Sequence, residues 1–450
     1  MGRRIFGTDG VRGRANEGFL SSYNLVRLAQ SIGLEFINGT HRHLVIIGKD
    51  TRLSGYMVEP ALTSGFISAG FDVVLVGPMP TPGIGMLVRS LRADLGIMIS
   101  ASHNPSYDNG IKIFGPDGYK LPDVVEKSIE KRFYEFSEDD LPPAEKLGHA
   151  KRLDDALGRY IEHVKTSFEK DIRLDGLKIV IDCAHGAAYK IAPTILWELG
   201  AEVIPIGIKP DGNNINQDCG ATNTVAMREA VLTHQAHVGI SLDGDGDRVI
   251  FSDEKGQIVD GDQILAMIGT LWSKQGRLSD NTVVATVMSN LGLEQYFQKQ
   301  GIAMLRTDVG DRYVIEAMRA KNLNVGGEQS GHIILRDYGT TGDGLVAMLQ
   351  VLRLLVQEKK PASHVFHIFT PILQIVNNYQ YRSKELLQNP KVQETIAHAE
   401  VTLKKAGGRL LVRRSGTEPL IRLMAECEDR RVMEGMIHYV METLAGEDRC

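Results

Sequence analysis

The stretch "HLVIIGKDTRLSG", residues 43–55, is an apolar, β-branched run that ends in a polar, glycine-containing turn. A helical segment follows it, and a second apolar run, "AGFDVVLVG", occupies residues 69–77. A strand, a turn, a helix and a second strand in this order form the unit that builds sheets with parallel strands and helices on their faces. The stretch therefore predicts an α/β fold.

The same unit recurs twice further along the chain. It returns as "LKIVIDCAHGAA" with "LGAEVIPIG" within residues 177–207, and as "NTVVATVMSNLG" with "QGIAMLRTD" within residues 281–308. Because the copies are widely spaced, they predict separate domains of similar design and not a solenoid. Beyond residue 368 the pattern changes and is typical of a smaller α+β domain. We expect three similar α/β domains with mixed sheets and then the α+β domain, at residues 1–150, 151–254, 255–368 and 369–450.

Composition and charge exclude several classes of protein. The chain has 450 residues, 43% of them hydrophobic, yet no apolar run approaches the roughly 18 residues of a membrane span. Its net charge of −5 gives no general basic field for nucleic acid. The N-terminus lacks the apolar core of a secretory signal, and the four cysteines form no C-x-x-C pair. We therefore expect a cytoplasmic protein with no zinc site, disulfide framework, membrane or nucleic-acid partner.

Ser102 follows the apolar run "LGIMIS", where a strand gives way to a loop. In α/β domains, loops at the carboxyl ends of strands form the ligand crevice, so this hydroxyl is a candidate functional group. The ordinary alternative is a serine that only caps a turn or helix. A serine hydrolase is disfavoured because there is no G-x-S-x-G turn, and because His103, as the next residue, is poorly placed to act as its base.

A second candidate is the segment "GISLDGDGDRVIFSD", which carries Asp243, Asp245 and Asp247 at alternate positions. Carboxylates this close repel one another unless a cation neutralises them, and an unpaired acidic surface loop is the alternative. An EF-hand fails because Arg248 occupies the position that requires glycine. Three oxygen ligands suit magnesium when a phosphate supplies further coordination.

Two further loops carry polar side chains on glycine-rich turns. "NVGGEQSGHIIL" offers Glu328, Ser330 and His332, an array suited to sugar hydroxyls, with a tight turn between two strands as the alternative. "LLVRRSGTEPLIR" combines arginine forks, hydroxyls and backbone amides, which together bind a phosphate dianion, with a solvated basic hairpin as the alternative.

Five motifs in order along the whole chain resemble those of the α-D-phosphohexomutases. They are "FGTDGVRG", "SASHNPSYDNGIK", "DGDGDR", "GGEQSGH" and "RRSGTEPLIR". The resemblance implies a heart-shaped, four-domain isomerase that moves a phosphoryl group through a sugar 1,6-bisphosphate. It is closest to members that interconvert glucosamine 6-phosphate and glucosamine 1-phosphate, an early step toward UDP-N-acetylglucosamine and the cell wall. Ala101 and Gln329 agree with those members.

The resemblance also implies roles for individual residues. Ser102 resembles the catalytic phosphoserine, and its phosphate oxygen would hold one Mg²⁺ per chain together with Asp243, Asp245 and Asp247. The proton-transfer groups would be Lys112 and His332. The residues lining the serine site would be Thr8, Asp9, Gly10 and Arg12, with Arg12 as the partner of the phosphoserine. The substrate-binding positions would be Arg248, Glu328 and Ser330. The loop that binds the distal phosphate would contain Arg413, Ser415, Gly416, Thr417 and Arg422.

The expected partners follow from the same resemblance. The substrate would be a hexosamine phosphate, glucosamine or glucose 1,6-bisphosphate would act as activator, and a homodimer is a possible assembly. One alternative is a phosphomannomutase or phosphoglucomutase of the same family. An alternative of another class is a non-catalytic sugar-phosphate or calcium-binding protein that has kept the loops.

Overall fold

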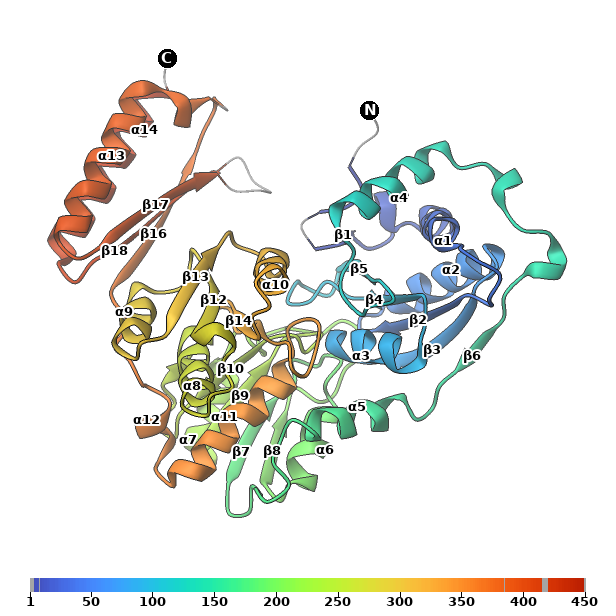
Figure 1. The fold of residues 1–450 in the computed structure, drawn as a ribbon, viewed down its shortest axis with the longest axis horizontal. Helices are drawn as coiled ribbons and strands as arrows, with labels where there is room; N and C mark the ends of the chain where they lie inside the picture. The colour runs from blue at the N-terminus through green and yellow to red at the C-terminus, as the bar shows by residue number, and fades with distance from the viewer. Residues whose placement is uncertain (1–3, 8, 384, 415–419, 449–450) are drawn as a thin grey trace. The chain divides into compact units, whose positions relative to one another are not determined.

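A computed structural model of the chain describes residues 4–7, 9–383, 385–414 and 420–448. These residues divide into two compact units (Figure 1). The first contains residues 1–286 and 305–368, and the second contains residues 287–304 and 369–450. The four ranges expected from the sequence are a finer division, and they stay a prediction.

The first sheet is mixed and has the strand order β1-β5-β4-β2-β3-β6. Its strands are β1 (Val11–Arg14), β2 (Leu44–Lys49), β3 (Asp72–Pro78), β4 (Leu95–Ile99), β5 (Asp108–Phe114) and β6 (Ala150–Arg152). The helices of this region are α1 (Ser22–Phe36), α2 (Gly55–Ser68), α3 (Thr81–Leu91) and α4 (Asp123–Glu135). β2 pairs in parallel with β3 and with β4, whereas β5 runs antiparallel to β4. The predicted strand, helix and parallel strand at residues 43–77 are thus confirmed.

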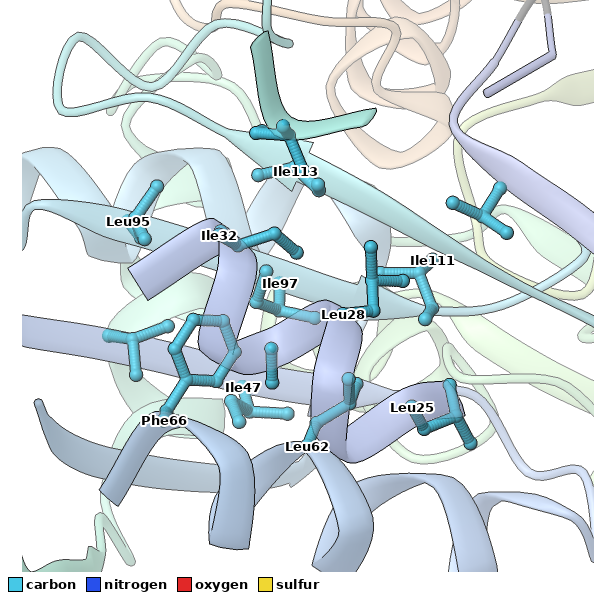
Figure 2. Close-up of a cluster of buried hydrophobic side chains, with 14 of the residues drawn as sticks. Leu25, Leu28, Ile32, Ile47, Leu62, Phe66, Leu95, Ile97, Ile111 and Ile113 are labelled. Atoms are coloured by element: carbon cyan, nitrogen blue, oxygen red, sulfur yellow. The ribbon is translucent and has the colours of Figure 1, made fainter. Parts of the chain in front are cut away.

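The core of this region lies between α1, α2 and the sheet (Figure 2). Leu25, Leu28 and Ile32 recur at the helical period on α1, so they share one buried face. Ile97 on β4 and Ile111 on β5 contribute buried side chains from the sheet to the same cluster. Burying each such side chain contributes about 1.5–3 kcal/mol relative to leaving it exposed. The strand ends that carry the site are therefore fixed by a well-packed scaffold.

The second and third sheets repeat the mixed arrangement. The second has the order β11-β10-β9-β7-β8, and the third has the order β13-β12-β14-β15. The strands of the second are β7 (Lys178–Asp182), β8 (Glu202–Ile206), β9 (Val238–Leu242), β10 (Val249–Ser252) and β11 (Ile258–Val259). The strands of the third are β12 (Thr282–Thr286), β13 (Ala303–Thr307), β14 (Val325–Gly327) and β15 (Ile333–Leu335). The helices are α5 (Ala156–Lys165), α6 (Ile191–Glu198), α7 (Val225–His234), α8 (Gly261–Lys274), α10 (Asp311–Ala320), α11 (Gly344–Glu358) and α12 (Ala362–Val365).

The second unit contains an antiparallel sheet with the strand order β16-β18-β17. Its strands are β16 (Gln374–Gln380), β17 (Arg409–Arg414) and β18 (Leu420–Glu426), and its helices are α9 (Leu291–Lys299), α13 (Pro390–Lys405) and α14 (Arg430–Glu447). The helix α9 and its flanks are tied to this sheet by Arg409, whose guanidinium donates to the carbonyls of Val287 at 3.0 Å and Ser289 at 2.6 Å. The predicted α+β domain is thus confirmed.

Short 3-10 turns connect several of these elements. They lie at Gly18–Leu20, Glu138–Asp140, Ala144–Lys146, Ser279–Asn281 and Leu386–Gln388. None of the helices in the described ranges is both long and apolar enough to cross a bilayer. The three cysteines among the described residues are buried and free.

Glu126 on α4 is a buried carboxyl, and its pKa is raised to about 7. Burial is the main cause, and it outweighs the attraction of Arg312, whose Nη1 lies 3.7 Å from Oε2. A folded-state pKa above the unfolded value means that the stability contributed by this group is fully present below about pH 4.5 and is lost as the pH rises through about 7.

We therefore expect Glu126→Gln to raise the melting temperature at pH 8.5 by about 1–2 °C, because roughly 1 kcal/mol of burial cost is removed from a large unit. At pH 5 the two proteins should melt at the same temperature, within about 0.5 °C. Thermal scans at both pH values measure this difference. Glu135→Gln, an exposed change on the same helix, is the control and should have no effect at either pH. A lower melting temperature for Glu126→Gln at pH 8.5 would contradict the prediction.

Candidate active site

Ser102 lies in the Ser102 loop, residues 100–107, which joins the carboxyl end of β4 to β5. Its side chain is buried, and its backbone has a φ of 52°, in the left-handed region. For a residue other than glycine, such a conformation costs about 1–3 kcal/mol and is concentrated at functional sites. The backbone N–H of Ser102 donates to Ser100 Oγ at 2.8 Å, which helps to fix the turn.

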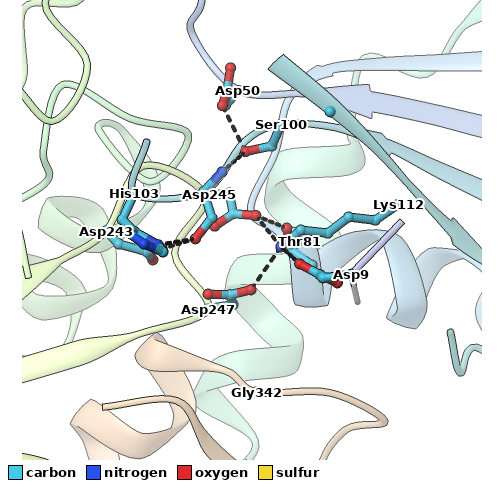
Figure 3. A network of polar contacts seen from close by, with 12 residues as sticks. Asp9, Asp50, Thr81, Ser100, His103, Lys112, Asp243, Asp245, Asp247 and Gly342 are labelled. Atoms are coloured by element: carbon cyan, nitrogen blue, oxygen red, sulfur yellow. Dashed lines mark hydrogen bonds and ion pairs between the residues drawn. The ribbon is translucent and has the colours of Figure 1, made fainter. Parts of the chain in front are cut away.

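The three aspartates occupy the three-carboxylate loop, residues 243–248, between β9 and β10. Ser102 Oγ donates to Asp243 Oδ2 at 2.6 Å, so the two sequence-predicted segments meet at the carboxyl ends of strands from two sheets. Asp243, Asp245 and Asp247 are all buried, and ligand atoms of the three lie within 4.8 Å of one another. Figure 3 shows these carboxylates converging with Lys112 and Thr81.

The donor set fits a hard divalent cation. Within the described residues, Asp245 Oδ1 and Asp247 Oδ1 are buried oxygens that have no hydrogen-bond partner. Burial, and then the charges of Asp247 and Asp245, raise the pKa of Asp243 well above its ordinary value. Asp247 differs, because although burial acts to raise its pKa, Lys112 and His332 bring it well below the ordinary value. The group still places three buried carboxylates together, and carboxylate oxygens are the ligands that hard cations prefer.

Lys112 on β5 supplies part of that charge. Its Nζ donates to Asp245 Oδ2 at 2.7 Å and to Asp247 Oδ2 at 3.0 Å, and Asp9 Oδ2 lies 3.6 Å away. Burial alone would lower the pKa of Lys112, but the attraction of Asp245 and Asp247 prevails and the pKa is raised well above its ordinary value. The side chain is thus held as an ammonium ion beside the carboxylates.

His332 approaches the same carboxylates from the third sheet. Its Nδ1 lies 3.6 Å from Asp247 Oδ1, and its Nε2 lies 3.7 Å from Asp311 Oδ2. Burial is the largest single effect on His332 and lowers its pKa, but Asp247, Asp311 and Glu328 together outweigh it, so the pKa is raised. His103 behaves differently, because burial and then Arg248 lower its pKa to about 4.

His103 Nδ1 also lies 3.3 Å from Ser102 Oγ. The sequence analysis expected His103 to be poorly placed as a base for its neighbour, and this stays a prediction, although the ring nitrogen lies within hydrogen-bond distance of the hydroxyl. The left-handed turn at Ser102 brings the two side chains together, which an extended backbone would not do. His103 is therefore a neutral neighbour of the serine hydroxyl.

The remaining sequence-predicted residues of the first unit surround these groups. The guanidinium of Arg12 pairs with Asp9, and Lys120 pairs with both Asp9 and Asp311. The backbone N–H of Arg248 donates to Asp243 Oδ1 at 3.1 Å. Glu328 Oε1 accepts from the N–H of Gly310 at 3.0 Å, and Ser330 is exposed on the same loop. Thr8 lies outside the described residues.

In the second unit, Arg413 and Arg422 stand directly opposite each other on β17 and β18. Asn378 on β16 is in turn opposite Arg422, so three polar side chains form one row across the sheet. All three line the same cavity, and Met288 also lines it. Ser415, Gly416 and Thr417, predicted in the connecting loop, lie outside the described residues.

Sequence reasoning missed several residues that shape the site. Thr81 Oγ1 donates to Asp245 Oδ2, and Asp50 and Arg52 lie beneath the Ser102 loop. Asp50 and Arg52 follow β2 directly, so the rule that ligand crevices form at the carboxyl ends of parallel strands could have found them. Lys120 carries no such signal, because its two partners are distant in the chain.

Comparison with known proteins defines the class. Family models described as phosphoglucomutase/phosphomannomutase match four consecutive segments of the chain: alpha/beta/alpha domain I at residues 3–139, domain II at 158–256, domain III at 260–372 and the C-terminal domain at 377–443. The chain belongs to this family, the α-D-phosphohexomutases.

Within the family, the chain is similar to phosphoglucosamine mutases. It is 57% identical to that of Paramagnetospirillum magneticum over 448 residues, which cover 99% of each chain, and 57% identical to that of Zymomonas mobilis, again with 99% of each chain covered. A Burkholderia thailandensis phosphoglucomutase/phosphomannomutase family protein superposes with a TM-score of 0.82 at 24% identity, covering 99% of this chain and 97% of that one. Aspergillus fumigatus N-acetylphosphoglucosamine mutase, solved with GlcNAc-6P and magnesium, gives a TM-score of 0.67 at 16% identity, covering 99% and 96%. At 24% and 16% identity, the similarities to these two solved structures show a shared fold only.

Proposed function

We propose that the chain interconverts glucosamine 6-phosphate and glucosamine 1-phosphate through a phosphorylated Ser102 and a glucosamine 1,6-bisphosphate. The observation that carries the proposal is the 2.6 Å contact between Ser102 Oγ and Asp243, inside a loop of three buried carboxylates. The substrate is inferred from the phosphoglucosamine mutases to which the chain is 54–57% identical.

The Ser102 hydroxyl would carry the phosphoryl group. In the forward step the bond from phosphorus to Ser102 Oγ breaks, a bond to the sugar hydroxyl oxygen forms, and the hydroxyl proton leaves. Asp243, Asp245 and Asp247 would hold one Mg²⁺ with a phosphate oxygen, and the bound ion would supply charge that offsets the negative charge of the transferred group. Arg12 would pair with the phosphoserine.

Lys112 and His332 would manage the proton. Neighbouring carboxylates raise the pKa of both, which favours their protonated forms. One of the two cations would give its proton to Ser102 Oγ as that oxygen leaves, and the neutral group so formed would take the proton of the sugar hydroxyl. We place Arg248, Glu328 and Ser330 on the sugar. The sugar bisphosphate must then turn around, so that its other phosphoryl group can return to Ser102.

The distal phosphate would bind on the loop between β17 and β18, at Arg413, Ser415, Gly416, Thr417 and Arg422. Two arginines opposite each other on neighbouring strands match the bidentate recognition of phosphate oxygens. Glucosamine or glucose 1,6-bisphosphate would act as activator, because it can phosphorylate Ser102 directly. A cytoplasmic location and a homodimer are further parts of this proposal.

Arg422→Ala should raise KM for the sugar phosphate by about 10- to 100-fold, because each lost charge-assisted hydrogen bond is worth roughly 1.5–3 kcal/mol. Ser102 should still become phosphorylated, and the variant should depend more strongly on added 1,6-bisphosphate. Steady-state kinetics and phosphoserine content on one preparation measure both. Arg414→Ala is the matched control, because residue 414 follows Arg413 on β17 and projects from the opposite face. An unchanged KM for Arg422→Ala would mean that this strand pair is only a basic hairpin.

Parallel assays on glucosamine 6-phosphate, glucose 1-phosphate and mannose 1-phosphate test the substrate. We expect kcat/KM for the glucosamine phosphate to exceed the other two by at least about tenfold, a difference of about 1.4 kcal/mol in transition-state binding. A preference for glucose or mannose phosphate would support the phosphoglucomutase or phosphomannomutase alternative. Tight binding without turnover on any of the three would support a non-catalytic sugar-phosphate binding protein.

A further inference from the structure

Arg52 is a fully buried arginine that lies beneath the Ser102 loop. Its Nη2 donates to the carbonyls of Ser102 and Asn104, both at 2.9 Å. Its Nη1 donates to the carbonyl of Asp108 at 3.0 Å and also to that of Pro105. A guanidinium has five N–H donors. Four of them thus bind backbone carbonyls, three in the Ser102 loop and one at the start of β5, and the fifth, on Nε, donates to Asp50.

Asp50 extends this support to the other side of the serine. Its Oδ2 accepts from Arg52 Nε at 2.8 Å and from Ser100 Oγ at 2.7 Å. Ser100 Oγ in turn accepts the backbone N–H of Ser102 at 2.8 Å. The peptide groups on both sides of Ser102 are therefore connected to one buried ion pair.

A second donor reaches the same loop from the second sheet region. Asn216 Nδ2 donates to the carbonyl of Ser102 at 2.9 Å and to that of Asn104 at 3.1 Å. Asn216 is itself in the left-handed region, with a φ of 59°. The carbonyl of Ser102 thus receives hydrogen bonds from two side chains that come from different sheets.

These contacts explain how Ser102 keeps a backbone conformation that serine disfavours. A serine with a φ of 52° keeps this backbone conformation only where several independent contacts enforce it. That backbone conformation sets the direction of Oγ, which points at Asp243 Oδ2. Because Asp50 neutralises Arg52, the pair adds no net charge to the site and acts through geometry.

We propose that Arg52 is a positioning residue, which holds Ser102 in the left-handed conformation and so aims Oγ at the three-carboxylate loop. This role of Arg52 rests on the proposed function, since it gives Arg52 a part in phosphoryl transfer through Ser102. Lysine cannot replace it, because an ammonium has only three donors and no planar fork to reach four carbonyls.

Arg52→Lys tests the proposal, with Arg336→Lys as the matched control. Arg336 also donates to backbone carbonyls, those of Met318 at 2.9 Å and Leu323 at 2.7 Å, in the third sheet region. We expect Arg52→Lys to lower kcat by about 10- to 100-fold with KM changed by less than about threefold, since a misplaced nucleophile impairs transfer more than binding. Backbone hydrogen exchange in residues 100–108 should accelerate by about tenfold or more. Arg336→Lys should leave kcat and this exchange unchanged.

Several outcomes would overturn the proposal. The first is an Arg52→Lys protein that folds and has unchanged kcat and unchanged hydrogen exchange in the loop. The second is a pair of lysine variants, Arg52→Lys and Arg336→Lys, that lose kcat equally and lose melting temperature equally. Should Arg52→Lys fail to fold, the same readouts on Asn216→Ala decide, and unchanged exchange and kcat there would also overturn it. The exchange measurement needs no turnover. Failure of the proposed function would be seen in a different measurement, because the unmodified chain would then show no mutase activity.

Discussion

Ser102→Ala should lose mutase turnover by about 10⁴-fold or more, because the alanine offers no oxygen to carry the phosphoryl group. Intact-protein mass spectrometry should find one phosphoryl group on a fraction of the unmodified chain, located on Ser102, and none on the variant. The variant should melt within a few degrees of the unmodified protein, since the change removes only the hydrogen bond to Asp243 and the longer contact with His103.

Ser106→Ala is the matched control, because it removes a hydroxyl from the same loop and should keep both turnover and phosphorylation. Incubation with glucose 1,6-bisphosphate sharpens the comparison. The control and the unmodified chain should then approach one phosphoryl group per molecule, whereas Ser102→Ala should gain none. Full activity in Ser102→Ala, or phosphate found only at other positions, would refute the role of Ser102 as carrier.

Asp245→Asn should lower kcat by about 100-fold or more and weaken Mg²⁺ binding by about 10- to 100-fold. The substitution keeps the shape of the side chain but removes one of the three negative charges that would attract the cation. It also removes the carboxylate that accepts from Lys112 and Thr81. The melting temperature should fall by much less in proportion, because the loss of these contacts is offset by reduced repulsion among the remaining carboxylates.

Isothermal titration with Mg²⁺ and activity before and after treatment with a chelator measure these effects. Asp218→Asn, an exposed change in the same sheet region at a left-handed position that asparagine tolerates, should alter neither quantity. If chelation leaves turnover unchanged and Asp245→Asn binds Mg²⁺ as the unmodified chain does, then the three aspartates are not a metal site.

Local sequence patterns predicted the elements of the fold well. The β-branched runs became β2, β7 and β12, because their side chains are buried within the sheets. The change of pattern after residue 368 corresponds to the antiparallel sheet β16–β18. Each of these signals lies within a dozen or so residues, where strand and helix periods act directly. The order of strands within each sheet was not predicted, because it depends on packing between distant segments.

The candidate site was predicted less evenly. Ser102 and the three aspartates meet, because they lie beside strand ends, where ligand crevices form, and Lys112 reaches them from within β5. The support beneath them was not foreseen. Lys120 joins Asp9 to Asp311, and no local pattern shows that these three residues are neighbours. The position of Arg52 just after β2 places it near the crevice, but only the folded loop shows that its guanidinium donates to four backbone carbonyls.

The tie between α9 and the C-terminal sheet also bears on how the polypeptide is made. Residues 287–304 belong to the second unit, yet the chain returns to the first unit at residue 305 before the second resumes at residue 369. A ribosome therefore releases α9 well before Arg409, which donates to the carbonyls of Val287 and Ser289. During synthesis, the segment that carries α9 therefore lacks its hydrogen bonds from Arg409 until almost the whole chain has emerged. A chain shortened at residue 368 would keep α9 but lose its partners, and the exposed segment would be open to proteases and to aggregation.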